Sequence, residues 1–247
     1  MRKPIILLLS CAFFFPSLFA QIGTQKVLLS NTAKSLEAES RSSFSEAIIK
    51  SKEKGWPVQY TTKNNQTASL IGIDRFGLPI YLTTYSDPVQ AITVNTNQLW
   101  QGGSTGFNLN GSSDSITNRI GVWDESSPRL THVEFAGRIT VKDNASKIVD
   151  HPTHVAGIIL GKGVNALAKG MSYGIKGAYA YDWNNDASEM SIAAANGLLI
   201  SNHSYGTVCG WDYNSDSSRW EFNGKYNEKE DYRFGLYDNQ AVLYDSA

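Results

Sequence analysis

The chain has 247 residues, of which 41% are hydrophobic, and its formal net charge is -1. This length suits one large domain or two small ones, and the hydrophobic content is sufficient for a buried core. A nearly neutral chain has no electrostatic attraction to nucleic acid or to an anionic membrane, so we expect neither as a partner.

Residues 1–20 have the composition of a secretory signal peptide. Two basic residues precede an apolar run from Ile5 to Phe15, and a cleavage region follows from Ser17 to Ala20. An uncleaved membrane anchor is the alternative, which Pro16 and the short run disfavour. We therefore expect a secreted protein, extracellular or periplasmic, without membrane attachment after cleavage. Cys209 is then the only cysteine, so we expect no internal disulfide.

Residues 21–95 predict a small α+β region. Residues 21–43 are polar and predict a flexible leader. Residues 44–54 predict a helix that ends at Gly55, and residues 69–83 predict a hairpin around a turn at residues 74–77. Residues 96–119 are rich in glycine and predict a linker into the main domain, which comprises residues 120–247.

Strands and helices alternate in residues 120–247. The apolar and helical patterns predict a strand at 120–123 that ends at Asp124, a helix near 154, a strand at 173–181, a helix at 187–196 and a strand at 198–201. This alternation predicts an α/β fold with a mostly parallel, doubly wound sheet. Functional residues of such sheets gather at the carboxyl ends of strands, where Asp124 and the segment after Ile200 lie.

Residues 151–157, His-Pro-Thr-His-Val-Ala-Gly, predict a histidine at the start of a helix, with Thr153 as N-cap. The positive end of the helix dipole disfavours an imidazolium, so His154 is expected to be neutral and to act as a base. Gly157 lies inside this helix, where glycine costs about 1 kcal/mol relative to alanine, so we expect close packing there. A zinc site formed with His151 is disfavoured, because Pro152 stands where a glutamate is expected.

These seven residues resemble the histidine motif of the subtilisin-like serine proteases, His-Gly-Thr-His-Val-Ala-Gly, with Pro152 as a departure. The resemblance implies a Ser-His-Asp triad in the chain order Asp, His, Ser. It implies that Asp124 accepts a hydrogen bond from Nδ1 of His154 and orients its ring. The loop after Asp124 departs from the family at Glu125, whereas residues 131–139 resemble its continuation.

Residues 201–206 resemble the family segment Asn-x-Ser-Leu-Gly. The resemblance implies that Ser204, Tyr205 and Gly206 line a cleft, where main-chain groups pair with an extended peptide or protein substrate. No cofactor or metal is expected, although calcium binding is common in the family. Residues 182–186 have a calcium-like spacing, but we interpret Asp186 as a helix cap and Glu189 as its capping-box partner.

The serine of the triad has no counterpart in the chain. The family presents it in Gly-Thr-Ser-x-Ala, which does not occur between Gly206 and Ala247. We therefore expect the front part of a secreted subtilisin-like endopeptidase, with a sheet incomplete at the C-terminus and no activity by itself. Residues 21–95 are then either an N-terminal extension or a pro-region. The alternatives are a non-catalytic secreted peptide-binding protein and a cysteine hydrolase that uses Cys209 with His154.

Overall fold

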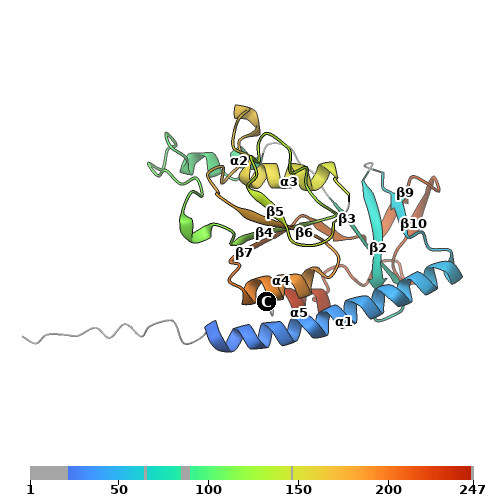
Figure 1. Ribbon diagram of the computed structural model, residues 1–247. Helices are drawn as coiled ribbons and strands as arrows, with labels where there is room; N and C mark the ends of the chain where they lie inside the picture. The colour runs from blue at the N-terminus through green and yellow to red at the C-terminus, as the bar shows by residue number, and fades with distance from the viewer. Residues whose placement is uncertain (1–21, 64–65, 85–89, 146, 246–247) are drawn as a thin grey trace, which may run out of the picture.

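The computed structural model of the chain describes residues 22–63, 66–84, 90–145 and 147–245 (Figure 1). The expected signal peptide lies outside these residues. The fold is mixed α/β: a four-stranded parallel sheet is combined with a four-stranded and a two-stranded antiparallel sheet. No described helix is long and apolar enough to cross a membrane.

The strands are β1 (Gln59–Thr61), β2 (Thr67–Ile73), β3 (Pro79–Thr84), β4 (Ile120–Asp124), β5 (Ile139–Val141), β6 (Ala178–Asp182), β7 (Ile200–His203), β8 (Tyr205–Thr207), β9 (Trp211–Asn214) and β10 (Arg219–Phe222). The α-helices are α1 (Ile22–Lys54), α2 (Gln90–Thr93), α3 (Asp150–Leu160), α4 (Asp186–Ala195) and α5 (Asn239–Asp245). Short 3₁₀ turns occupy Thr96–Leu99, Asp114–Ile116 and Ala166–Ala168.

Helix α1 is much longer than the sequence predicts. Its end before Gly55 is confirmed, and Gly55 adopts the left-handed conformation that stops a helix, with φ +72°. The flexible leader predicted for residues 21–43 is wrong from Ile22 onward, because this segment continues the same helix. Tertiary packing explains the difference: Ala33 is fully buried and its carbonyl accepts a hydrogen bond from Ser188 of α4 at 2.7 Å.

The predicted hairpin is confirmed as β2 and β3, which pair antiparallel from Ser69↔Leu82 to Ile73↔Pro79. Asp74 stabilises the turn, because its Oδ1 accepts hydrogen bonds from the backbone N–H groups of residues 76 and 78. The antiparallel sheet has the order β1-β2-β3-β8. A strand from the middle of the main domain therefore completes the sheet of the N-terminal region.

The parallel sheet has the order β5-β6-β4-β7, with α3 on one face and α4 on the other (Figure 1). This confirms the predicted parallel sheet with helices on both faces. Strand bounds differ from prediction: β6 begins at Ala178 rather than at residue 173, and β7 begins at Ile200 rather than at residue 198. Residues 173–177 instead lead up to the sheet, and Arg138 binds the carbonyls of Tyr173 and Ile175.

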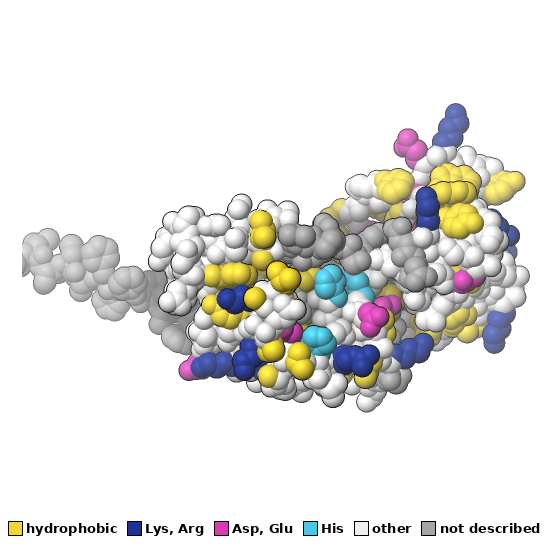
Figure 2. Space-filling model, turned by 90° about the horizontal axis from the view of Figure 1, so that it is seen from above, with side chains coloured by type: hydrophobic (Ala, Val, Ile, Leu, Met, Phe, Trp, Pro, Cys, Tyr) yellow, Lys and Arg dark blue, Asp and Glu magenta, His cyan; other side chains and the backbone are white. Residues whose placement is uncertain are grey.

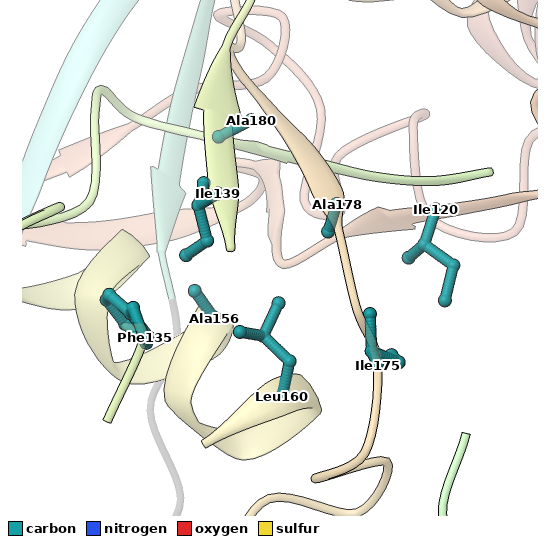
Figure 3. Packing of buried hydrophobic residues seen from close by; sticks show 8 residues of the cluster. All are labelled: Ile120, Phe135, Ile139, Ala156, Leu160, Ile175, Ala178 and Ala180. Atoms are coloured by element: carbon teal, nitrogen blue, oxygen red, sulfur yellow. The ribbon is translucent and has the colours of Figure 1, made fainter. Parts of the chain in front are cut away.

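Each face of the parallel sheet has its own core. The α3 face buries a cluster to which Ala156 and Leu160 of α3 contribute, pointing toward Ile139 of β5 and Ala178 of β6 (Figure 3). The α4 face buries Trp123, Tyr181, Met190 and Ala193. Glycine is required at residue 121, because a Cβ there would lie 2.4 Å from the ring of Trp123.

Candidate functional site

Asp124 is the last residue of β4, at the carboxyl end of a central parallel strand. Its side chain is 1% exposed. Oδ1 accepts a hydrogen bond from the backbone N–H of Glu125 at 2.7 Å. A carboxylate that is removed from water in this way needs further donors, because an unpaired buried charge is strongly unfavourable.

His151 supplies such a hydrogen-bond donor to Asp124. Its Nδ1 lies 2.9 Å from Oδ1 and 3.0 Å from Oδ2 of Asp124, and its side chain is 10% exposed. A carboxylate only accepts hydrogen bonds, so Nδ1 carries the hydrogen. In the neutral ring the lone pair then belongs to Nε2, the nitrogen that can take up a proton. The pair thus has the geometry of a base held by an orienting carboxylate.

The hydrogen bond that the sequence predicts for His154 is therefore made by His151 instead. His154 is exposed and lies three residues further along α3. The cause is the start of the helix: α3 begins at Asp150, so His151 lies in its first turn and next to the end of β4. Pro152 is tolerated in the first turn, because the N–H groups there have no partner within the helix.

Thr153 is not the N-cap of α3, which is a second correction. Thr153 is a residue of the helix itself. Its hydroxyl donates to the carbonyl of Val149 at 2.8 Å and accepts from the N–H of Arg129 at 2.8 Å. The residue that precedes the helix is Val149, which forms no side-chain cap. Thr153 therefore ties the loop after β4 to the helix that carries His151.

The surroundings of Gly157 in α3 also differ from expectation. A Cβ at Gly157 would meet no atom within 4 Å apart from the helix itself and its neighbours, so no close packing requires glycine there. The close approach occurs at Gly161 and Gly170, where a Cβ would lie 2.5 Å from a backbone atom. Helix α3 is thus packed tightly against the following loop at its C-terminal end.

Glu134 and Arg138 hold this end of α3. Three backbone N–H groups, of residues 163, 164 and 165, donate to the carboxylate of Glu134, which is 3% exposed. Burial by itself would raise the pKa of Glu134, but these hydrogen bonds outweigh it and lower the pKa. Arg138 donates to five backbone carbonyls, among them that of Leu160 at 2.6 Å. Residues 131–139, which resemble the family, thus include the two side chains that hold the C-terminal end of α3 in place.

The upper face of the molecule displays histidine side chains close to acidic ones (Figure 2). Glu125 is one acidic residue near the pair: burial raises its pKa, the charge of Asp124 raises it further, and His151 acts in the opposite direction. Glu125 departs from the family pattern, and it adds a second carboxyl group beside the pair.

Ser204 directly follows β7, at the same edge of the parallel sheet as Asp124. Val122 of β4 is paired with Asn202 of β7, and alternate residues of a strand share a face. Asn202 therefore faces the same side as Val122 and Asp124, and its amide donates to Oγ of Ser204 at 2.9 Å. Asn202 is the asparagine of the segment that resembles Asn-x-Ser-Leu-Gly, but the sequence predicts no role for it, and its place on the Asp124 side follows from the register of β4 and β7.

Tyr205 and Gly206 lie in β8, which pairs antiparallel with β3 through Thr84↔Tyr205 and Thr83↔Gly206. The main-chain edge that was expected to receive an extended peptide is thus paired with the chain's own N-terminal region on one side. The Tyr205 side chain points to the α4 face, where its hydroxyl donates to Oδ2 of Asp186 at 2.7 Å.

Asp186 and Glu189 do not form the predicted capping box, which corrects the expectation from the sequence. Asn185 precedes α4 with φ +61° and forms no side-chain cap. Glu189 instead accepts a hydrogen bond from the indole of Trp123 at 3.1 Å. Burial raises the pKa of Glu189 to about 8. Asp186 binds both at the helix start and beneath β4: its Oδ1 accepts the backbone N–H of Ala187 at the start of α4 at 2.6 Å, and its Oδ2 accepts from two tyrosine hydroxyls beneath β4.

No group of three or more histidine, cysteine, aspartate or glutamate side chains in the described part of the chain is arranged to hold a metal ion. Asp182, from the segment with calcium-like spacing, accepts the N–H of Asn184 at 2.7 Å. Burial raises the pKa of the Cys209 thiol, which disfavours the thiolate that a cysteine hydrolase needs.

A scan against models of protein families, a search of curated proteins and a search of solved structures each found no match. The sequence did contain a signal for His151: an acidic residue at 150 and a proline at 152 are both favoured in the first turn of a helix, so they indicate a helix start near His151. Placing the helix there would have moved the first turn from His154 to His151.

Proposed function

We propose that the chain is the front part of a secreted serine endopeptidase of the subtilisin type, in which His151 is the base and Asp124 orients it. The observation that carries the proposal is the hydrogen-bonded pair of Asp124 and His151 at the carboxyl edge of a parallel sheet. The order of the two residues in the chain agrees with the family resemblance. His151 replaces His154 as the base, because it is the histidine that Asp124 holds.

The nucleophile of this proposal is a serine encoded after Ala247. Once a serine hydroxyl lies within hydrogen-bond reach of Nε2 of His151, the ring takes its proton as the oxygen attacks the scissile carbonyl. The buried carboxylate of Asp124 then stabilises the imidazolium. Residues 21–95 serve as an N-terminal extension or pro-region whose strand β3 covers one edge of β8.

Sequencing the coding DNA downstream of Ala247 tests the nucleophile. We expect the reading frame to continue into a Gly-Thr-Ser-x-Ala motif roughly 100 residues later. In the extended protein, His151→Ala should lower kcat on a peptide substrate by about 10⁴-fold to 10⁶-fold. His154→Ala is the matched control and should retain kcat within a few-fold, because His154 is exposed.

Two results would contradict the proposal. A stop codon directly after Ala247 would leave the triad incomplete, and loss of activity in His154→Ala but not in His151→Ala would return the base to His154.

A non-catalytic peptide-binding protein is the second candidate. It is supported by β8, which lies at the end of its sheet and pairs only with β3 among the described strands. Among the described strands its other edge has no partner, and an unpaired edge can receive an added strand, a common mode of peptide recognition. This function becomes the leading one if the frame ends at Ala247. Fluorescence anisotropy of a labelled extended peptide, with the chain as it stands, would then measure binding.

A further inference from the structure

His203 lies at the junction of β7 and β8, in a compact cluster on the α4 face of the parallel sheet. Its ring stacks on Trp123 with a centroid distance of 5.0 Å and an interplanar angle of 10°. On its other sides it contacts Tyr205 and Tyr244, with centroid distances of 5.7 Å and 4.9 Å. The ring therefore touches β4, β8 and α5 at once.

The hydrogen bonds of this cluster determine which ring nitrogen of His203 carries the hydrogen. Asp186 accepts from the hydroxyls of Tyr205 and Tyr244. Because the Tyr205 hydroxyl donates to Asp186, its oxygen accepts the hydrogen on Nδ1 of His203, at 2.7 Å. Nε2 is then the nitrogen with the lone pair. It is buried and has no hydrogen-bond partner among the described residues.

A second proton on His203 would disturb this arrangement. It would create a buried N–H donor without an acceptor among the described residues, and it would hold a positive charge away from water. The titratable groups around His203 are Asp186 of α4, Tyr205 of β8 and Tyr244 of α5, and Asp186 alone favours the charged ring. Burial outweighs this attraction and lowers the pKa of His203. The cluster is thus most stable with a neutral ring and weakens as the pH falls below about 6.5, the ordinary histidine value.

We propose that His203 is an acid-sensitive catch: its protonation displaces Tyr205 and loosens the pairing of β8 with β3, which exposes the strand edge that the N-terminal region covers. The link is direct, because Tyr205 is both the hydrogen-bond partner of His203 and the register partner of Thr84. The role of His203 in controlling access to a peptide-binding edge rests on the proposed function. The acid dependence of the pairing between β8 and β3 does not rest on it.

Hydrogen exchange of the complete chain at pH 7.5 and pH 5.0, corrected for the intrinsic exchange rate, tests the catch. We expect the protection of residues 82–84 and 205–207 to fall at least about tenfold at pH 5.0, while the β1–β2 pairing keeps its protection. In His203→Asn the side-chain amide can still donate to Tyr205 but cannot take up a proton, so the difference between the two pH values should vanish. The exposed His132 provides a matched control, and His132→Asn should behave like the unmodified chain.

Equal protection at both pH values, or the same acid-dependent loss in His203→Asn, would overturn the proposal. If His203→Asn does not fold, NMR titration of the histidine rings in the unmodified chain decides the question. A His203 midpoint at or above 6.5, the ordinary histidine value, would contradict the catch. None of these measurements depends on peptidase activity, so failure of the catch and failure of the proposed function are separate outcomes.

Discussion

Two neighbouring residues of β4 face opposite sides of the parallel sheet and have opposite surroundings. Asp124 faces α3 and is bound to one histidine at the edge of the sheet. Trp123 faces α4, stacks on Tyr181 with a centroid distance of 4.1 Å, and donates to the half-buried Glu189. The α3 face thus carries a simple polar pair, and the α4 face carries a dense aromatic and carboxyl network.

The larger pKa shifts belong to the α4 face, where burial raises the pKa of Glu189 to about 8. Perturbed pKa values are often used to find functional sites, but structural networks perturb them as well. The raised pKa of Glu189 follows from burial within the packed residues of the α4 face. Geometry at the carboxyl end of β4 is the better guide, and the following predictions test that view.

Asp124→Asn should have the largest effect. In a catalytically complete, extended protein, it should lower kcat by about 10⁴-fold, because an asparagine amide can favour the wrong tautomer of His151. Asp182→Asn is the matched control, since Asp182 is the register partner of Asp124 on β6, and should change kcat by less than about tenfold. Steady-state kinetics on one peptide substrate measure both. Equal losses in the two variants would place the chemistry elsewhere.

Glu189→Gln should stabilise the chain above neutral pH. The pKa of Glu189 is raised on folding, so its contribution is fully present below about 4.5, the unfolded value, and is lost as the pH rises toward about 8. Glutamine removes the ionisation and still accepts the indole N–H. We expect urea unfolding to show equal stability at pH 4.5 and a gain of about 1 kcal/mol or more at pH 8. A loss of stability at pH 8 would mean that the carboxylate has partners that compensate its burial.

Gly157→Ala should have the smallest effect. A Cβ at this position meets no neighbouring atom, so alanine should raise the free energy of unfolding by about 0.5 to 1 kcal/mol through its helix propensity. Gly161→Ala is the control, because a Cβ there would lie 2.5 Å from the carbonyl oxygen of Ala168, and it should destabilise the chain. Chemical denaturation of the two variants measures the contrast. Destabilisation by Gly157→Ala would mean that the surroundings of residue 157 are packed too closely for a methyl group.

Elements with a strong local signal were predictable. The hairpin of β2 and β3, the strand that ends at Asp124 and most of α4 follow from turn residues and from the spacing of apolar side chains. The carboxylate of the candidate site was found in the same way, because the end of an apolar strand is visible in the sequence. Its histidine partner was not, because a three-residue shift in a helix start is within the uncertainty of local patterns.

The sequence by itself determined the alternation of strands and helices, the residues of the motif and the position of Asp124, because these depend on contacts between near neighbours. Only the tertiary structure decided that His151 is the partner of Asp124, that residues 22–43 are helical and that β8 pairs with β3. These features depend on contacts between residues far apart in the chain: α1 is helical where α4 packs against it, and β8 has a partner because the hairpin folds back onto it.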